Sequence, residues 1–449
     1  MYVDFLIERF EANPSNEAMV WKGKSATYAE LLQTYQEAVK RIDEAGIQPS
    51  SVVSVEADFS ANSVAYLLAL AEKGCILVPL TSSVEASKPE FREIAEVEWQ
   101  VLISEEDEVQ FMPTGTELTH PILTDLKKTG HPGLILFSSG STGKPKAAVH
   151  DLSYLLEKFH VPRHSRRTIA FLLFDHIGGI NTLLYTLSNA GCVITVQDRS
   201  PDAVCEVIEK HQAAVLPTSP TFLNLLLISG AAQRHDLSSL KLITYGTEPM
   251  PEATLKRLHQ TLPDVELLQT YGLSEVGILR SKSESSDSLW VKIGGEGYET
   301  RVVDGLLEIK AKSAMLGYLN APSPFTEDGW FITGDAVEVK GEYFKILGRK
   351  SEMINIGGEK VYPAEVEGVL TTMPGVEDAV VTGERNAITG MMVKAVVRLS
   401  TEETPAEFRK RMREFCADKL ANFKVPQKVE IVSDSLHGER FKKLRSKVQ

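Results

Sequence analysis

The sequence predicts an α/β fold: a large N-terminal domain of mostly parallel sheets flanked by helices plus a small β subdomain, and a small mobile α+β C-terminal domain. The first 350 residues alternate helical patterns with short apolar runs. Strands that alternate with helices favour parallel sheets whose faces are covered by helices. Near residue 300 the runs alternate in polarity, and after residue 350 a new series of elements begins. We therefore expect one domain at residues 1–350 and a second at 351–449.

Periodicity and turn residues locate the individual elements. Helical spacing predicts an amphipathic helix in the first 14 residues and further helices at 28–47 and 62–74. Short apolar runs bounded by turn residues predict strands at 50–57, 75–80, 167–174, 191–196, 213–218 and 240–246. Hairpin turns are expected at Asp304-Gly305 and Lys340-Gly341. The C-terminal domain is expected to contain a helix after the stretch 348–370, strands at 376–384 and 391–400, and a helix at 405–420.

Composition is that of a soluble globular protein, and we expect a cytoplasmic location. The 449 residues carry 48 Lys and Arg against 61 Asp and Glu, a formal net charge of −13. This balance argues against a nucleic-acid or anionic-membrane partner. The four cysteines are widely spaced and are expected to be reduced and mostly buried. No apolar run reaches the ~20 residues of a membrane span, and the acidic N-terminus does not resemble a signal peptide. No pattern indicates an oligomeric state.

The stretch LILFSSGSTGKPKAAVH, residues 134–150, is the first candidate for a ligand site. An apolar strand runs into a loop whose two glycines, Gly140 and Gly143, permit positive φ and close approach to a ligand. Its hydroxyls, together with Lys144 or Lys146, suit phosphate oxygens. The loop therefore predicts phosphate binding, with a plain surface loop as the alternative.

The P-loop of nucleoside triphosphatases, G-x-x-x-x-G-K-[ST], does not fit this stretch. Ser138 stands where the first glycine must be, and Pro145 follows Lys144 where the motif needs a hydroxyl. A helix is expected to start after the loop, near Ala147.

Several further motifs follow in a fixed order. They are LPTSPTFLNLLL (216–227), ITYGTEPMPEA (243–253), QTYGLSEVG (269–277), GYLNAPSPFTEDGWFITGDAVEV (317–339) and GRKSEMINIGGEKVYPAEVE (348–367). With the serine- and glycine-rich loop, they resemble the adenylate-forming superfamily of acyl-CoA and aryl-CoA synthetases, luciferases and peptide-synthetase adenylation domains. The resemblance runs from about residue 26 to the C-terminus, and its motif style is closest to acyl- or aryl-CoA ligases.

The resemblance implies an ATP-dependent acid–thiol ligase. A carboxylic acid would be activated as acyl-AMP with release of pyrophosphate and then transferred to CoA. ATP and Mg²⁺ are the implied cofactors, CoA is the co-substrate, and a small carboxylic acid is the partner. Two alternatives stay open: an acyl-AMP ligase that loads the phosphopantetheine thiol of a carrier protein in trans, and a protein that binds ATP or acyl-adenylate with impaired turnover.

Catalytic roles are implied for Thr142, which would grip the β- and γ-phosphates, and for Glu275, which would hold Mg²⁺. Tyr271 would stack on the adenine, Asp335 would accept both ribose hydroxyls, and Arg349 would lie near the ribose or a phosphate. The implied ATP site comprises Ser138, Ser139, Gly140, Ser141, Thr142, Gly143, Lys144, Gly246, Thr247, Glu248, Tyr271, Gly272, Ser274, Asp335 and Arg349.

The C-terminal domain departs from the family pattern at its catalytic lysine. Relatives carry T-x-x-G-K-x-x-R, and counting through the preceding strand places the lysine on Lys442 and the arginine on Arg445. Phe441 stands where glycine is usual, and Gly438 stands where threonine is usual. Lys442 is the expected adenylation lysine, and Lys443 is the neighbour that could replace it.

The implied hinge and acceptor loop lie at the start of the second domain. Ser351 occupies the hinge, where relatives usually carry Asp or Lys, and a hinge need not be one residue type. Gly357, Gly358 and Glu359 resemble the loop that admits the thiol in CoA ligases. Glycines at two of the acid-pocket positions, 272 and 277, are expected to leave room for a ring or chain. The implied acid pocket comprises His176, Gly178, Thr221, Gly246, Gly272 and Gly277.

Overall fold

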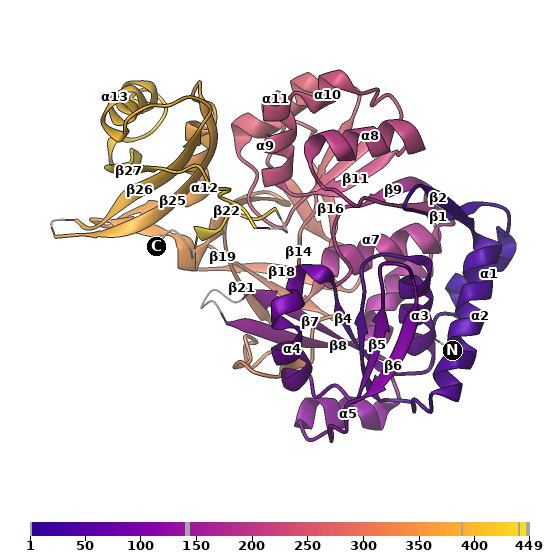
Figure 1. The fold of residues 1–449 in the computed structure, drawn as a ribbon. Helices are drawn as coiled ribbons and strands as arrows, with labels where there is room; N and C mark the ends of the chain where they lie inside the picture. Colours follow the sequence, from indigo (N-terminus) through magenta and orange to yellow (C-terminus); the bar gives the residue numbers. More distant parts are fainter. Residues whose placement is uncertain (1, 140–143, 388, 439–440, 446–449) are drawn as a thin grey trace.

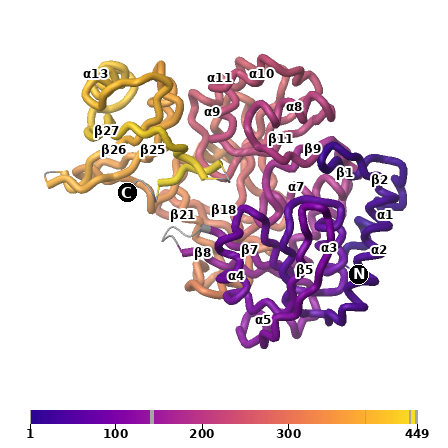
Figure 2. Tube along the Cα trace, viewed as in Figure 1, coloured from indigo at the N-terminus to yellow at the C-terminus, as the bar shows by residue number. Residues whose placement is uncertain are grey.

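The structure is a computed structural model that describes residues 2–139, 144–387, 389–438 and 441–445. Within these residues it has two large mixed sheets with helices, a six-stranded antiparallel sheet, and a separate α+β part at the C-terminus (Figure 1). The predicted fold class is therefore confirmed. The Cα trace shows the C-terminal part, in orange and yellow, at one side of the molecule beside α9 and α11 (Figure 2).

The first large sheet has the strand order β13-β12-β11-β9-β10-β1-β2. Its strands are β13 (Glu266–Gln269), β12 (Leu242–Tyr245), β11 (Val215–Thr218), β9 (Arg167–Ala170), β10 (Cys192–Thr195), β1 (Glu17–Trp21) and β2 (Lys24–Thr27). All neighbours are parallel except β1 and β2. The connecting helices are α7 (Ile177–Ser188), α8 (Pro201–His211), α9 (Pro220–Ser229), α10 (Ala231–Arg234) and α11 (Glu252–Thr261).

The second large sheet has the order β20-β8-β7-β4-β3-β5-β6. Its strands are β20 (Gly317–Tyr318), β8 (Pro145–Asp151), β7 (Gly133–Ser139), β4 (Ile76–Leu80), β3 (Val52–Glu56), β5 (Trp99–Ile103) and β6 (Val109–Pro113). The four central strands, from β7 to β5, are parallel and the outer pairs are antiparallel. The helices of this part are α1 (Asp4–Ala12), α2 (Tyr28–Glu44), α3 (Ala61–Glu72), α4 (Lys88–Ile94), α5 (Pro121–Thr129) and α6 (Leu152–Leu156).

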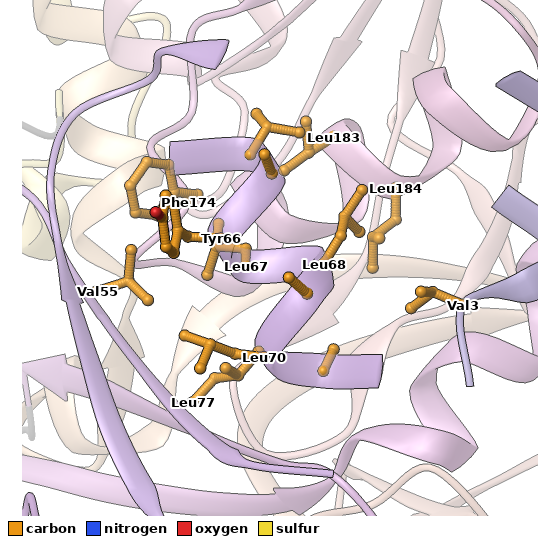
Figure 3. Close-up of a cluster of buried hydrophobic side chains, with 14 of the residues drawn as sticks. Val3, Val55, Tyr66, Leu67, Leu68, Leu70, Leu77, Phe174, Leu183 and Leu184 are labelled. Atoms are coloured by element: carbon orange, nitrogen blue, oxygen red, sulfur yellow. The ribbon is translucent and has the colours of Figure 1, made fainter. Parts of the chain in front are cut away.

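Helix α3 forms the centre of the largest apolar core because it is apolar on every face, a pattern that buries a helix completely. Its side chains pack against the N-terminal segment, β3, β4 and α7 (Figure 3). The labelled contacts are Tyr66, Leu67, Leu68 and Leu70 of α3 with Val3, Val55, Leu77, Phe174, Leu183 and Leu184. This core joins elements from both large sheets and holds the start of α7, which carries one of the expected site residues.

The prediction of a helix near Ala147 is wrong. The chain returns from β7 directly into β8, and the two strands pair antiparallel from Gly133↔Asp151 to Ser139↔Pro145. Ala147 and Ala148 are fully buried in β8, between β7 and β20. The two strands therefore form an antiparallel hairpin rather than a strand–helix unit.

The small β subdomain is a fully antiparallel sheet of order β16-β17-β22-β21-β19-β18. Its strands are β16 (Arg280–Ser283), β17 (Val291–Gly294), β18 (Tyr298–Val303), β19 (Leu306–Ala311), β21 (Phe331–Lys340) and β22 (Tyr343–Arg349), and the short pair β14 (Gly272–Leu273) and β15 (Gly277–Ile278) precedes it. The turn at Asp304-Gly305 is confirmed, with φ values of 51° and 77°. The second turn falls one residue later than expected, at Gly341-Glu342.

The C-terminal part contains β23 (Ile354–Ile356), β24 (Glu359–Val361), α12 (Pro363–Leu370), β25 (Val376–Asn386), β26 (Gly390–Leu399), α13 (Pro405–Cys416) and β27 (Lys428–Ile431). It has its own core, to which α12, both long strands and α13 contribute. The 3₁₀ turn Lys350–Glu352 joins β22 to β23, and a domain boundary after residue 350 stays a prediction.

Two expectations from composition are tested by the structure. The four cysteines all lie within the described residues, and each is buried and free of a disulfide bond, as expected. In the part of the chain that the structure describes, no helix combines the length and the apolar character that crossing a membrane requires.

Candidate active site

The expected site residues gather where strands of the first sheet end. The segments that follow β9, β11, β12 and β13 begin at Phe171, Ser219, Gly246 and Thr270. Because these four strands are parallel, their carboxyl ends lie along one edge of the sheet, where open α/β sheets bind their ligands. The antiparallel sheet contributes Asp335 and Arg349 to the same region.

Asp335 lies between two partners that the sequence motifs had named. The Tyr271 hydroxyl donates to Asp335 Oδ2 at 2.5 Å, and Arg349 Nε lies 2.7 Å from Asp335 Oδ1. Strands β21 and β22 place Asp335 opposite Arg349 in register. Burial raises the pKa of the Asp335 carboxyl, and the charge of Arg349 opposes that rise. A carboxylate accepts about four hydrogen bonds, so both oxygens retain capacity for further donors.

Glu275 is hydrogen-bonded to β20, the strand that pairs with β8 after the serine- and glycine-rich loop. The Tyr318 hydroxyl donates to Glu275 Oε1 at 2.6 Å, and the Lys146 ammonium lies 5.3 Å from the centre of the Tyr318 ring. Burial and the nearby Glu275 charge raise the pKa of Tyr318. Tyr318 was not predicted as a site residue, although it stands near the start of a recognised motif.

The loop itself is only partly covered by the structure. Gly140, Ser141, Thr142 and Gly143 lie outside the described residues, so their predicted roles stay predictions. Ser138 pairs with Lys146 in the β7–β8 hairpin, and Ser139 ends β7. Lys144 is exposed just before β8.

The segment after β12 holds a glycine that its surroundings require. A Cβ on Gly246 would lie 2.6 Å from the Thr270 carbonyl oxygen, so a side chain there would collide with backbone. Thr247 is exposed with φ at 73°. The Glu248 carboxylate accepts a hydrogen bond from the Thr221 backbone N–H at 2.8 Å. Glu248 therefore caps the first turn of α9. From the sequence it was expected only to line the adenine.

His176 begins α7 as its N-cap. Its Nδ1 accepts from the Gly178 backbone N–H at 3.2 Å. A Cβ on Gly179 would lie 1.9 Å from the Leu173 carbonyl oxygen, so the double glycine permits α7 to approach the preceding loop. His176 is half-buried, and a gating role for it stays a prediction.

The expectation that Gly272 leaves open space for the acid is contradicted by its close neighbours, and the same expectation for Gly277 stays a prediction. A Cβ on Gly272 would lie 2.4 Å from Ile278 Cδ1. Gly277 has φ at 84°, a left-handed conformation that favours glycine, and Leu155 Cδ2 lies 3.1 Å from its ideal Cβ position. Close packing and backbone conformation explain both glycines. Ser274 is buried, and its carbonyl oxygen accepts from His150 Nε2 at 2.5 Å.

The C-terminal tail returns to this edge of the first sheet. The Ser219 hydroxyl, at the N-cap of α9, donates to the Phe441 carbonyl oxygen at 2.8 Å. The Phe441 ring packs against Phe171 and Phe222, with ring centres 5.3 and 5.5 Å away. Lys442 follows directly, so its backbone lies at the ends of β9 and β11.

Lys443 and Arg445 are held within the C-terminal part. The Lys443 ammonium pairs with Asp378 and donates to the Ala379 carbonyl oxygen at 2.8 Å. Burial lowers the pKa of Lys443, but the neighbouring Asp378 and Glu367 outweigh it and the net pKa is raised. Arg445 pairs with Glu367 at 2.6 Å. Lys443 thus takes part in a buried ion pair, and its role as the possible replacement for Lys442 stays a prediction.

The expected hinge and thiol-side loop are exposed. Ser351 lies in the 3₁₀ turn between β22 and β23. Gly357 and Gly358 form the β23–β24 turn with φ values of 60° and 99°, and Glu359 starts β24. The Gly358 N–H donates to Asn355 Oδ1 at 2.9 Å, which fixes the turn.

This chain has a large α/β part, followed by an α+β part whose tail returns to the strand ends. That arrangement is the adenylate-forming fold. Residues 6–311 match the family described as AMP-binding enzyme, and residues 365–443 match the AMP-binding enzyme C-terminal domain. The chain belongs to the AMP-binding enzyme family.

Three relatives indicate the range of this family. The chain is 28% identical over 334 residues to indoleacetate–CoA ligase of Aromatoleum aromaticum, a match that covers 68% of this chain and 64% of that protein. It is 24% identical to 2-succinylbenzoate–CoA ligase of Listeria monocytogenes serotype 4b, over 96% and 95% of the two chains. It is 25% identical to the fatty acid–[acyl-carrier-protein] ligase ScoC of Streptomyces coeruleorubidus, over 97% and 93%.

A solved structure supports the fold. The anthranilate CoA ligase AuaEII in complex with anthranoyl-AMP superimposes with a TM-score of 0.84 at 19% sequence identity, covering 100% of this chain and 96% of that one.

Proposed function

We propose that this protein is an AMP-forming acid–thiol ligase that activates a carboxylic acid with ATP and transfers the acyl group to CoA. The observation that carries this proposal is the buried Asp335 carboxylate held between Tyr271 and Arg349 at the strand ends. Such a carboxylate suits two adjacent ribose hydroxyls. The family membership and the CoA ligases among its relatives supply the reaction class.

In the first step a carboxylate oxygen of the acid attacks the α-phosphorus of ATP. The bond from that phosphorus to the bridging oxygen breaks, so pyrophosphate leaves and acyl-AMP forms. Thr142, with the neighbouring loop residues and Lys144, would bind the β- and γ-phosphates. Lys442 would bring its positive charge to the α-phosphate, where charge builds up in the transition state.

Mg²⁺ fits the donor set that the described residues offer. Mg²⁺ is bound in nucleotide sites by one or two carboxylates, with phosphate oxygens and water completing its shell. Among the described residues no group of three or more His, Cys, Asp or Glu could hold a metal by itself, and Glu275 is the single carboxylate we assign. When bound, Mg²⁺ would screen the triphosphate. Tyr318 would orient Glu275 through the hydrogen bond described above.

In the second step the thiolate of CoA attacks the acyl carbonyl, and AMP leaves as the acyl–oxygen bond breaks. The C-terminal part would first rotate about Ser351, carrying Lys442 away and bringing Gly357, Gly358 and Glu359 toward the acyl group. The acid would lie between the segments after β9, β11 and β13, near His176 and Thr221. Gly178 and Gly246 shape the backbone beside them, as the close approaches around these glycines suggest.

A carrier-protein thiol is the second candidate acceptor, and the similarity to ScoC favours keeping it. The chemistry of the first step is unchanged, and only the thiol differs. The alternative of a protein with impaired turnover is supported by the altered lysine motif alone. The variant Lys442→Ala tests this alternative, because pyrophosphate release collapses only if this lysine is catalytic.

The deciding experiment measures pyrophosphate release from MgATP with a panel of aryl, short-chain and medium-chain acids, each with and without CoA. Release with one class of acid, accelerated by CoA and accompanied by acyl-CoA of the expected mass, supports the proposal. Slow release that CoA does not accelerate, but that a phosphopantetheinylated carrier protein does, favours the second acceptor. Absence of release with every acid contradicts the ligase proposal.

A further inference from the structure

Phe441 has a backbone conformation that its residue type disfavours. Its φ is 51°, in the left-handed region where glycine is common and bulky residues are rare. Such a conformation persists only when the surrounding structure holds it. Two backbone hydrogen bonds hold Phe441 and Lys442 beside Gly438: the Phe441 N–H donates to the Gly438 carbonyl at 2.9 Å, and the Gly438 N–H donates to the Lys442 carbonyl at 3.1 Å.

The Phe441 ring contacts the N-terminal part. It contacts Phe171, directly after β9, and Phe222, in the first turn of α9, both of which are almost fully buried. His437 stacks on the same ring at 5.2 Å, and the Arg199 guanidinium lies 5.8 Å from its centre. The ring therefore joins a tail residue to the core of the first sheet.

The residues on the far side of Lys442 are fixed to the C-terminal part. Lys443 pairs with Asp378, and Arg445 pairs with Glu367 and Glu352, all of which follow residue 350. The tail is thus held at two points. One is the contact of Phe441 with the N-terminal part, through its ring and through the hydrogen bond from Ser219 to its carbonyl, and the other is a set of ion pairs within the C-terminal part.

We propose that Phe441 is a positioning residue that docks the tail on Phe171 and Phe222 and thereby sets Lys442 in place for adenylation. The proposal rests on the ligase function proposed above. Lys443 and Arg445 are bound to the C-terminal part, whereas the Phe441 ring is bound to the N-terminal part. A rotation of the C-terminal part therefore carries Lys443 and Arg445 with it and withdraws the Phe441 ring from Phe171 and Phe222. Phe441 acts in the first step and is released before the second.

The test compares Phe441→Ala with Phe441→Leu in the two half-reactions. In Phe441→Ala, the kcat for adenylation falls at least tenfold with little change in the KM for ATP, and thioester formation from supplied acyl-adenylate stays at the wild-type rate. Phe441→Leu, which keeps an apolar side chain, retains most of the adenylation rate. Equal loss in both half-reactions, or unchanged adenylation, overturns the proposal.

A double variant tests whether Phe441 acts through Lys442. If it does, adding Phe441→Ala to Lys442→Ala lowers the residual adenylation rate no further, because coupled residues are not additive. Multiplicative losses mean that the two residues act independently, and they overturn the proposal.

A measurement without catalysis separates this proposal from the ligase function. Spin labels on cysteines introduced at the exposed positions Glu206 in α8 and Lys410 in α13 report the distance between the two parts of the chain. The docked distance dominates in the wild type with MgATP, and its population drops in Phe441→Ala and recovers in Phe441→Leu. An unchanged distribution in Phe441→Ala refutes docking by the ring, whether or not any acid is activated.

Discussion

Replacing Lys443 with methionine removes one partner of a buried ion pair. The Lys443 side chain is 10% exposed and that of Asp378 is 3% exposed, so solvent screens the pair little. Breaking a buried pair from one side typically costs about 3–5 kcal/mol, because the remaining charge stays buried without a partner. We expect the C-terminal part to lose stability by that amount in Lys443→Met.

The matched variant is Lys443→Met combined with Asp378→Asn. Removing both charges leaves no unpaired ion, and replacing a buried pair is often close to neutral. The double variant is therefore expected to recover most of the lost stability. A further comparison is Lys442→Met, which leaves the Lys443–Asp378 pair intact and is expected to impair pyrophosphate release.

Native-state hydrogen exchange of the β25 amides is the suitable assay, because a chain with two parts need not unfold in one step. At ~1.4 kcal/mol per factor of ten, Lys443→Met should accelerate exchange in β25 by about 100-fold to several thousand-fold. Acceleration below about tenfold, or a double variant as unstable as the single one, would show that the pair does not stabilise this sheet as we argue.

Two further variants probe groups nearer the site. Tyr271→Phe removes the donor to Asp335 and should lower the free energy of unfolding by about 1.5–3 kcal/mol, the usual range for a hydrogen bond to a charged group. Denaturant titration with and without MgATP measures it, and a loss below 0.5 kcal/mol, on the order of an ordinary surface substitution, contradicts the assignment. Lys158 donates to the Ile278 carbonyl at 2.9 Å, and burial, aided by Arg163 and Arg280, lowers its pKa to about 7. The unfolded chain therefore binds more protons than the folded one above pH 7, so Lys158 makes stability rise with pH from about 7 to about 10. Thermal unfolding across that range should show a steeper rise in the wild type than in Lys158→Met, and parallel profiles would contradict it.

The fold and the order of motifs could be read from the sequence because they depend on local patterns. Alternating strands and helices gave the class, and the Asp304-Gly305 turn formed as expected because its residues suit positive φ. The prediction of a helix near Ala147 was wrong because two adjacent alanines fit a strand that is paired on both sides as well as they fit a helix. Only the neighbouring strands β7 and β20 decide between them.

Site residues were harder to predict when their role depends on a distant partner. Tyr318 binds Glu275 across 43 positions, and Phe441 packs on residues more than 200 positions away. A single sequence contains no signal for such pairs. The glycine at 272 was misinterpreted for a related reason, because the absence of a side chain does not reveal whether a neighbour already fills the space.

The arrangement of β8 and β20 has a consequence for the interpretation of mutagenesis. Lys146 follows the serine- and glycine-rich loop on β8, and Tyr318 on β20 contacts both Lys146 and Glu275. A change at any of these three positions disturbs the environment of the other two. The effects of these substitutions on nucleotide affinity should therefore be measured in single and double variants. If only single variants are measured, the interaction energy between two of these residues is counted once for each of them.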